Sequence, residues 1–267
     1  MFEIATSNSQ IATKSRTSPP VSSALIMAGR CLRLTSRKVD AMITSLMLPI
    51  MLMLLFVYLF GGAIQTGTDY LTYVVPGVML LCAGFGASAT GVTVSEDMHN
   101  GIIDRFRSLD INGMPVLAGH VVASVVRNAV STLIVFGVAF LIGFRPDASP
   151  LDWLAAGGVL LLFILAMSWL SAAIGLLAKS AEAASGFTFF VMFLPYASSA
   201  FVPIRTMPWW IQGFAAHQPV TPVTETLRAL LLGTSTGNNA WLALVWCGGI
   251  ILISLALCNV LYRRRTA

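Results

Sequence analysis

Long apolar blocks constrain the fold of this chain more than any other feature of its sequence. Each block is close to the roughly 20 residues that an α-helix needs to cross a bilayer. The six blocks are 41–64, 70–94, 121–144, 153–178, 183–204 and 241–262. Charged residues make up only 10% of the chain, whereas they make up about a quarter of a soluble domain. The sequence therefore predicts an all-α integral membrane protein with six transmembrane helices.

Several kinds of chemistry have no matching motif in this sequence. The cysteines are scattered without metal-binding or redox spacing, and His99, His120 and His217 are isolated, so we expect solvated or interfacial histidines and no metal site. No Gly-x-x-x-x-Gly-Lys-Ser/Thr motif for a nucleoside triphosphate occurs. The blocks also lack the repeated carboxylates of a proton-coupled carrier. We therefore expect no enzyme and no cofactor in this chain, and any energy for transport must come from elsewhere.

The distribution of Lys and Arg predicts how the chain is oriented in the membrane. Both tails and one set of loops hold Lys14, Arg16, Arg30, Arg33, Arg37, Lys38, Arg105, Arg107, Lys179, Arg263, Arg264 and Arg265. The opposite loops hold only Arg145, Arg205 and Arg228. Because basic residues favour the cytoplasmic side, we expect a multi-pass plasma-membrane protein with both termini in the cytoplasm. The net charge of +5 then sets topology and does not indicate a nucleic-acid partner.

Two features inside the blocks concern helix packing. Arg127 is the single charge within a block, about two turns from its start, where a long side chain can extend back to the interface. Small residues spaced four apart let another backbone approach closely. These pairs are Ala83/Ala87, Gly84/Ser88 and Ala87/Gly91. They predict either a static packing seam or a helix that slides or pivots.

The chain before the first block divides into two parts. Residues 1–21 are polar and rich in Ser and Thr, which predicts a disordered cytoplasmic tail, and residues 22–267 form one transmembrane domain. At about 100° per residue, Arg30, Arg33 and Arg37 share one face of a helix whose other face is apolar. This pattern predicts an amphipathic helix on an anionic lipid surface. A solvated cluster of charges beside the membrane is the alternative.

The segment 205–233 is too apolar to be a free external loop. Its paired tryptophans suit a membrane interface, its prolines interrupt it, and its last part, 224–232, has a helical pattern. We expect one or two short re-entrant or interfacial helices on the outer side. The residues that define this outer segment are Pro208, Trp209, Trp210, Pro219, Pro222, Glu225 and Arg228. The last two form either an ordinary ion pair within a helix or part of a gate at the exit.

A polar island between the second and third blocks is unusually rich in charged residues for this chain. Six charges fall within fifteen residues, at Glu96, Asp97, Asp104, Arg105, Arg107 and Asp110. The basic residues place this island on the cytoplasmic side. Such a concentration of charge in an apolar chain indicates contact with water or with another protein.

The residues of this island resemble a known family. Asp97 to Leu109 reads Asp-Met-His-Asn-Gly-Ile-Ile-Asp-Arg-Phe-Arg-Ser-Leu, and Val-Leu-Ala-Gly follows at 116–119. This stretch resembles the cytoplasmic signature of ABC-2-type exporter permeases, above all of their daunorubicin-resistance branch. The motifs at 199–203, 207–210 and 217–228 are similar to the segment before the last span in the same branch. The resemblance covers about residues 25–265.

The resemblance implies the ABC-2 permease fold, with a cytoplasmic coupling helix that contacts a separate ATPase. The corresponding residues are Gly101, Ile102, Ile103, Asp104, Arg105, Phe106, Arg107, Ser108 and Leu109. Phe106, between its two arginines, would insert into a groove of the ATPase, although these arginines could instead only set topology. Two permease chains, identical or merely similar, would pair with two ATPase copies, which bind ATP and Mg²⁺, while membrane lipid surrounds the spans.

The implied function is export of an amphipathic compound, such as an antibiotic, another drug or a lipid-like metabolite, out across the plasma membrane. Export of a polysaccharide or similar polymer by the same family, and a membrane sensor without transport, are the alternatives. The sequence departs from the family pattern at three positions. Asp110 stands where many relatives have proline, and His120 and Ser124 stand where relatives often carry arginine and aspartate. We expect these last two changes to weaken a polar network at the base of the third span.

Overall fold

The computed structural model describes residues 29, 39–64, 66–99 and 113–266, and these residues form helices and turns with no strand among them. The elements in chain order are α2 (Val39–Leu54), the π-helical η1 (Leu55–Phe60), α3 (Tyr70–His99), α5 (Gly113–Leu141), α6 (Pro150–Leu177), α7 (Ala181–Val191), the 3₁₀-helical η2 (Ile204–Thr206), α8 (Trp209–His217), α9 (Val220–Leu231) and α10 (Asn239–Thr266). The all-α membrane class is confirmed. The predicted tail 1–21, the face of Arg30, Arg33 and Arg37, and the coupling helix Gly101–Leu109 lie outside the described residues.

Four of the described helices, α3, α5, α6 and α10, are long and apolar enough to cross a membrane. They correspond to the second, third, fourth and sixth apolar blocks. The first block forms α2 and η1, and the part of it whose side chains the structure describes, Leu46–Phe60, is a shorter apolar helix. The prediction of full-length spanning helices is therefore confirmed for four of the six blocks.

The fifth apolar block does not form one continuous helix, contrary to the prediction. After α7 ends at Val191, the chain continues in turns whose amides donate three residues back, as from Leu194 to Val191 (3.2 Å) and from Tyr196 to Phe193 (3.1 Å). Pro195 has no N–H for an α-helical bond and disfavours helical geometry in the residue before it. Hydropathy alone does not reveal this break, because the residues around Pro195 are apolar.

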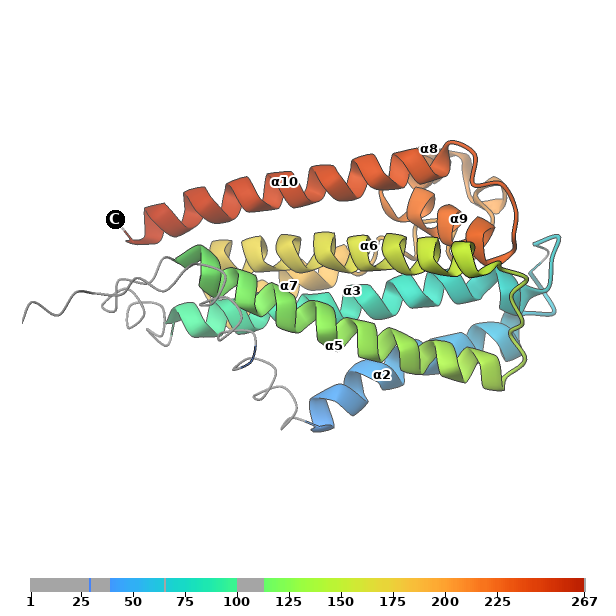
Figure 1. Ribbon diagram of the computed structural model, residues 1–267, viewed down its shortest axis with the longest axis horizontal. Helices are drawn as coiled ribbons and strands as arrows, with labels where there is room; N and C mark the ends of the chain where they lie inside the picture. Colours follow the sequence, from blue (N-terminus) through green and yellow to red (C-terminus); the bar gives the residue numbers. More distant parts are fainter. Residues whose placement is uncertain (1–28, 30–38, 65, 100–112, 267) are drawn as a thin grey trace, which may run out of the picture.

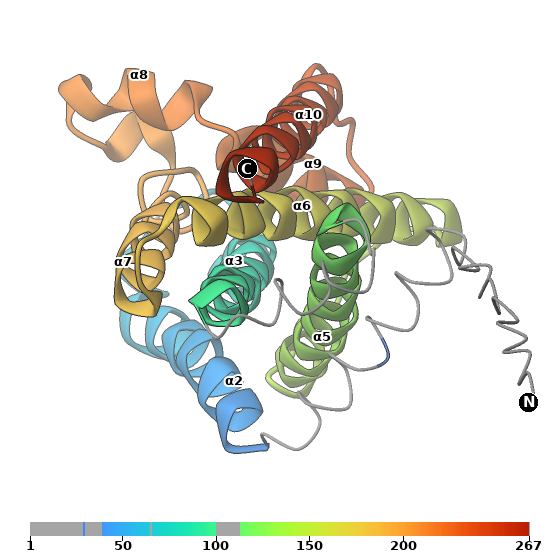
Figure 2. The same ribbon diagram turned by 90° about the vertical axis from the view of Figure 1, so that its left-hand side faces the viewer.

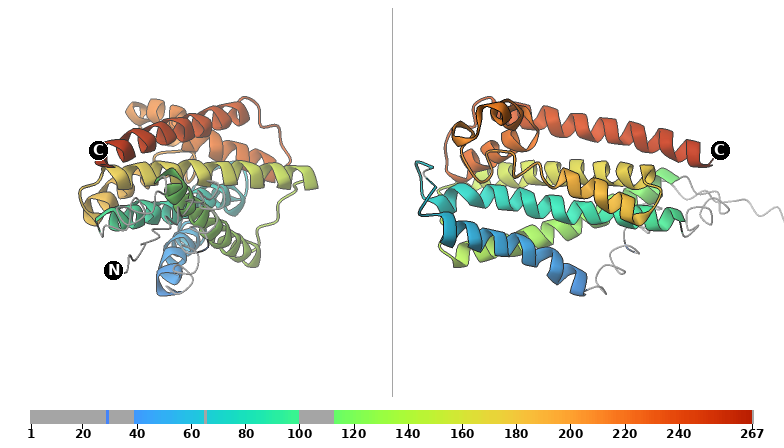
Figure 3. Two further views of the ribbon diagram at one scale, coloured as in Figure 1. Left: turned by 60° about the vertical axis from the view of Figure 1, so that its left-hand side comes forward. Right: turned by 180° about the vertical axis from the view of Figure 1, so that it is seen from behind.

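Helix α3 lies at the centre of the bundle. Of its most apolar stretch, 83% is buried, whereas the corresponding figure for α10 is 22%. It packs against α2, α5, α6, α7 and α9, as the view along the bundle in Figure 2 shows. The helices run along the long axis between two ends (Figures 1 and 3). We call them the α8–α9 end, where α3, α6 and α10 begin, and the C-terminal end, where α10 stops.

Local signals account for where several helices begin and end. Ser149 and Asp152 form a reciprocal capping box at the start of α6, with Pro150 in the first helical position. Gly143 after α5 and Gly233 after α9 have φ of 109° and 62°. Glycine adopts this left-handed conformation without the steric cost of a Cβ. These two glycines therefore allow α5 and α9 to end at the α8–α9 end of the bundle.

The small residues of α3 form a packing seam with α6. A Cβ on Gly175 of α6 would overlap the carbonyl of Gly91, and Ala87 is 1% exposed. A Cβ on Gly84, by contrast, would meet no atom within 4 Å. The predicted close approach is therefore confirmed for the Ala87/Gly91 pair and not for Gly84.

Candidate functional site at the α8–α9 end

Arg228 is the centre of the α8–α9 end of the bundle. Its residue surface is only 7% exposed. The guanidinium donates to Glu225 Oε1 (2.7 Å), to the Tyr73 carbonyl (3.0 Å) and to the Ser199 carbonyl (2.9 Å). It also lies 3.7 Å from the centre of the Tyr73 ring, which is a cation–π contact. One side chain thus joins α9 to α3 and to the turns that follow α7.

The ion pair between Glu225 and Arg228 within a helix is confirmed, and the structure adds that Arg228 is buried. Burying a guanidinium costs several kcal/mol unless hydrogen bonds and an opposite charge compensate. Here the forked donors reach two backbone carbonyls as well as the carboxylate. The arginine is therefore a structural tie between distant segments.

Two tyrosines of α3 hold the same irregular stretch. The hydroxyl of Tyr73 donates to the Ser199 carbonyl and that of Tyr70 to the Phe201 carbonyl, each at 2.9 Å. Gly77, one turn further along α3, faces Ala200 so closely that an added Cβ would lie 2.6 Å from the Ala200 side chain. The first turns of α3 therefore fix the chain between α7 and η2.

Polar side chains at the start of α9 satisfy more of this non-helical backbone. Thr221 Oγ1 accepts from the Ser199 amide (3.3 Å) and donates to the Ala215 carbonyl (2.6 Å). Gln218 donates to the carbonyls of Leu194 (3.1 Å) and Ala197 (3.3 Å). Irregular backbone survives in a membrane only where protein or a water-filled cavity satisfies it. Here the irregular backbone is hydrogen-bonded by the side chains of Arg228, Tyr70, Tyr73, Thr221 and Gln218.

The prolines of the outer segment mark helix starts. Pro208 and Pro219 are the residues before the first turns of α8 and α9, and Pro222 lies in the first turn of α9, where its missing N–H would have no intrahelical partner. The helix predicted over 224–232 therefore begins earlier, at Val220. The start of this helix was predicted too late, because Pro222 was expected to interrupt the helix.

The predicted tryptophans do not join Arg228. Trp209 and Trp210 begin α8 and are 85% and 68% exposed. Helix α8 extends sideways from the bundle (Figure 2), whereas nine residues of α9 are buried. The outer segment thus divides into a buried helix, α9, and an exposed aromatic helix, α8.

A second polar contact lies toward the C-terminal end and was missed by the sequence analysis. Nε2 of His120 in α5 lies 3.1 Å from Oδ2 of Asp97 in the last turn of α3, and both side chains are largely buried. The prediction of a solvated or interfacial histidine is therefore wrong for His120. It is confirmed for His99 and His217, which are exposed. The pair connects the two helices that flank the polar island.

Two further polar contacts of α5 concern residues that the sequence analysis singled out. Arg127 donates to the Gly86 carbonyl of α3 (3.1 Å), so its side chain turns toward α3 and does not extend to the interface. The hydroxyl of Ser124 lies 2.9 Å from that of Ser168 in α6. Ser124 therefore takes part in a polar contact between α5 and α6, and the weakening expected relative to other family members stays a prediction.

Metal chemistry has no support in the part of the chain that the structure describes, because no group of three or more His, Cys, Asp and Glu side chains lies close enough to hold an ion there.

Comparison with known proteins decides the family. Residues 23–232 match the family model described as ABC-2 type transporter. The chain belongs to the ABC-2 type transporter family. It is 32% identical over 228 residues, 85% of this chain and 81% of the relative, to the daunorubicin resistance ABC transporter permease protein DrrB1 of Streptomyces coeruleorubidus. It is 24% identical over 246 residues, 91% of this chain and 89% of the relative, to the probable doxorubicin resistance ABC transporter permease protein DrrC of Mycobacterium tuberculosis strain H37Rv.

Membership in the ABC-2 family confirms the resemblance to drug-resistance exporter permeases. It makes the chain a membrane-spanning subunit of a transporter. The family also implies that this subunit works with an ABC ATPase and pairs with a second permease.

Proposed function

We propose that this chain is the permease subunit of an ATP-driven exporter that moves an amphipathic compound out across the plasma membrane. The compound is a drug, an antibiotic or a lipid-like metabolite. The family supports ATP-driven transport, and the names of the two relatives, which refer to daunorubicin and doxorubicin resistance, support a drug-like cargo. The observation that carries the cargo class is a row of aromatic rings along one side of the bundle.

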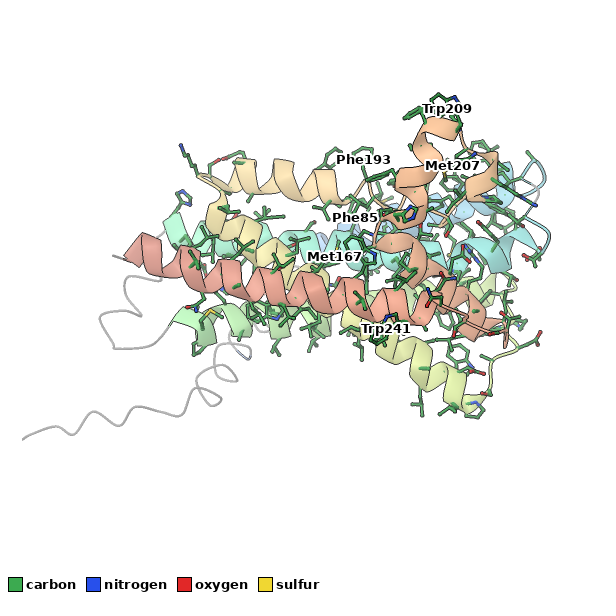
Figure 4. All side chains as sticks on the ribbon, turned by 90° about the horizontal axis from the view of Figure 1, so that it is seen from above. Phe85, Met167, Phe193, Met207, Trp209 and Trp241 are labelled. Carbon is green, nitrogen blue, oxygen red and sulfur yellow. The ribbon has the colours of Figure 1, made fainter. Side chains whose placement is uncertain are left out.

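This row, the aromatic ladder, joins two distant parts of the sequence. Its members in spatial order are Phe189, Phe193, Tyr196, Phe201, Phe56 and Phe60. Successive ring centres lie 5.1, 5.9, 5.3, 4.7 and 5.6 Å apart, within the range of attractive aromatic pairs. Phe193 is labelled in Figure 4. The ladder passes from α7 through the turns after it to η1.

The exposed members make the ladder suitable for an apolar, ring-containing cargo. Phe189 is 56% exposed, Phe193 52% and Tyr196 36%, so their rings offer faces and edges beyond those used in the row. A flat apolar molecule gains both area burial and ring contacts there, and the Tyr196 hydroxyl supplies a polar group beside them. This arrangement suits an amphipathic aromatic compound.

An efflux assay with the ATPase co-expressed tests the proposal. Replacing Phe189 and Phe193 together by Ala should reduce export of fluorescent amphipathic compounds by about tenfold, because each aromatic contact contributes about 0.5–1.5 kcal/mol beyond its buried area. The matched control is Leu252→Ala on α10, where an apolar side chain of similar exposure, 69%, lies outside the ladder. Unchanged export in the double variant would contradict the assignment of the ladder to the cargo.

Energy reaches the permease, in this proposal, through Gly101–Leu109 on the cytoplasmic side. Arg105, Phe106 and Arg107 contact the ATPase, which binds the ATP and Mg²⁺, and both termini lie in the cytoplasm. The pair of Asp97 and His120 supports this route, because it joins α3 to α5, the two helices that the segment connects in the sequence. A displacement of the segment is then passed to both helices together.

Co-purification tests this contact. Changing Arg105 and Phe106 together to Ala should abolish recovery of the ATPase with a tagged permease, while the permease itself still inserts. Arg205→Ala, at the exposed residue in η2, is the control for loss of one arginine. Retained ATPase binding would contradict the coupling assignment, and a permease that never binds an ATPase would favour the sensor alternative.

Arg228 and the outer segment close the exit in this proposal. The turns that Arg228 and Tyr73 hold at Ser199 lie between Tyr196 and Phe201 of the ladder, so opening there requires these bonds to break. Arg228→Lys keeps the charge but loses the forked donors. It should change the efflux rate while the chain still folds, and an unchanged rate would remove Arg228 from the gate.

A polymer exporter is the second candidate, because sugar rings also stack on aromatic side chains and the ladder offers several in a row. The two candidates differ in their response to the double phenylalanine variant. A polymer exporter would lose export of surface polysaccharide and leave the efflux of small amphipathic compounds unchanged.

A further inference from the structure

Arg127 places a charge near the middle of the membrane-spanning bundle. It is the central residue of the 29-residue helix α5, so at 1.5 Å per residue it lies about 20 Å from either end of that helix. Two acceptors of its side chain, on Gly86 and Thr90, also lie near the middle of their helix, α3. Ionisable groups at this depth are costly, and they typically mark the pathway of a substrate or an ion.

The surroundings of Arg127 differ from those of Arg228. The Arg228 guanidinium is enclosed, and it donates to a carboxylate and to two backbone carbonyls. Arg127 remains half-buried, and the Gly86 carbonyl (3.1 Å) and the Thr90 hydroxyl (3.4 Å) both accept from the same nitrogen, Nη2. These two acceptors are uncharged and hold the side chain against α3. Arg127 is therefore fixed in position and still accessible from the surface of the bundle.

Helix α3 reaches the molecular surface beside Arg127. Most of α3 is buried at the centre of the bundle (Figure 2), yet Ala89 and Thr93 are exposed. They follow Gly86 by three and seven residues, and residues at these spacings share one face of a helix. The exposed surface next to the contact between Arg127 and Gly86 therefore consists of small and hydroxyl-bearing side chains.

Polar groups continue from Arg127 toward the C-terminal end of the bundle. Thr93 and Glu96 are exposed on α3, and the pair of Asp97 and His120 joins the same two helices. His120 precedes Arg127 by seven residues, so both lie on the face of α5 that packs against α3. A polar head group that enters beside α3 and α5 from this end therefore meets hydrogen-bonding groups as far as the middle of the bundle.

The chemistry at Arg127 favours an anion. A guanidinium presents N–H donors in a planar fork that matches the oxygens of a carboxylate, a sulfate or a phosphate. The carboxylates of α3, on Glu96 and Asp97, come about 9 Å or more beyond Thr90 along the helix axis, so the part of α3 next to Arg127 is uncharged. Away from water, an anion and a guanidinium each reduce the cost of burying the other.

We propose that the cargo is an amphipathic anion and that Arg127, between α3 and α5, binds its negatively charged head group. The apolar part of the cargo lies against Val126 and Val130, the neighbours of Arg127 on α5 that are 42% and 43% exposed. A head group of this kind belongs to a small amphiphile or to an anionic lipid. The inference rests on the proposed function and narrows its substrate class, and the site uses none of the rings of the aromatic ladder.

Binding of a matched pair of fluorescent probes tests the site. The full-length chain is held in phosphatidylcholine nanodiscs without an ATPase, and the partition of each probe into empty nanodiscs is subtracted. The probes are a dansyl-labelled undecyl sulfate and the matching undecanol, which differ in the charge of the head group. The readout is the ratio of their dissociation constants. Arg127→Gln should lower the preference for the sulfate by about tenfold, because a hydrogen bond to a charged group corresponds to about one decade or more in affinity.

Three further variants separate binding from folding. Arg145→Gln, at an exposed arginine that follows α5, is the matched control and should keep the full preference for the sulfate. Arg127→Lys keeps the charge but loses the fork, so it should retain part of the preference. Ala89→Glu leaves Arg127 unchanged and places a carboxylate beside it, so it should exclude the sulfate as strongly as Arg127→Gln. This variant supplies the test if Arg127→Gln does not fold.

Phosphatidic acid added to the nanodiscs identifies the source of the head group. Displacement of the sulfate from the protein, corrected with empty nanodiscs of the same composition, assigns the site to an anionic lipid, whereas retained binding assigns it to a smaller amphiphile. Both results support an anion site. An unchanged preference in both Arg127→Gln and Ala89→Glu overturns the inference, as does tighter binding of the undecanol to the native chain. Export by the ladder variants is measured independently, so the proposed function is tested separately.

Discussion

Helices α8 and α9 are neighbours in one apolar segment, yet they differ in almost every physical property. Nine residues of α9 are buried, and its Arg228 bonds to α3 and to the turns after α7. One residue of α8 is buried, and its aromatic side chains are exposed. Two short helices of one segment therefore have different uses: α9 packs within the protein, whereas α8 leaves its aromatic side chains exposed. Substitutions in the two helices should separate these uses.

The largest effect is expected from Arg228→Met. The substitution keeps an apolar stem but removes the guanidinium donors of Glu225 and of the Tyr73 and Ser199 carbonyls, so that the Ser199 carbonyl keeps only the Tyr73 hydroxyl. A hydrogen bond to a charged group contributes about 1.5–3 kcal/mol, so the free energy of unfolding should fall by roughly 3 kcal/mol. Thermal unfolding in detergent, followed by near-ultraviolet circular dichroism, measures the loss. Arg205→Met at the exposed arginine is the control, and equal effects of the two variants would contradict the tie.

Gly77→Ala should have the next largest effect. The new methyl group would lie 2.6 Å from the Ala200 side chain and 2.7 Å from its carbonyl oxygen, so α3 must separate from the turns that Arg228 holds. Overpacking of this kind costs about 1–3 kcal/mol. Gly84→Ala, on the same helix but with no atom within 4 Å, should instead raise stability by up to about 1 kcal/mol. The difference in midpoint temperature between the two variants is the measurement.

Tyr73→Phe should have a moderate effect. It removes one hydroxyl that donates to the Ser199 carbonyl and preserves the ring beneath Arg228. A single hydrogen bond contributes about 1 kcal/mol, and Arg228 still donates to the same carbonyl. Tyr58→Phe, at a residue 70% exposed, is the control and should not change the unfolding midpoint in detergent. A loss as large as that of Arg228→Met would mean that the hydroxyl and not the guanidinium holds the turns.

The smallest effect on folding is expected in α8. Trp210→Ala removes an aromatic side chain that is 68% exposed, so unfolding in detergent should change by less than about 0.5 kcal/mol. A strong destabilisation in detergent would place α8 in the folded core and would remove its distinction from α9.

The sequence predicted the outer segment as a whole better than its parts. Paired tryptophans and prolines indicated short helices there, and two short helices are present. The spacing of Glu225 and Arg228 also indicated their ion pair correctly. The burial of Arg228 was missed. Two of its partners are backbone carbonyls, and because every residue has one, no pattern of side chains in the sequence predicts such a contact. The roles of Tyr70 and Tyr73 were missed for the same reason.

The predictions for His120 and Arg127 were wrong for a related reason, because their partners could not be read from the sequence. His120 was expected to meet solvent because no metal or catalytic spacing surrounds it, yet it lies against Asp97. Arg127 was expected to extend along its own helix, yet it bonds to α3. In both cases the partner lies on a neighbouring helix, and only the packing of α3 against α5 brings the two groups together.

The sequence by itself determined the membrane class, the family and most of the helices, because hydropathy and motifs are properties of neighbouring residues. The tertiary structure alone decided which charges are buried and which aromatic residues remain exposed. The bond from Arg228 to the Tyr73 carbonyl joins residues 155 positions apart, and no local spacing encodes such a contact. It forms because α9 packs beside the start of α3, where the loss of water makes each polar group depend on a partner within the protein.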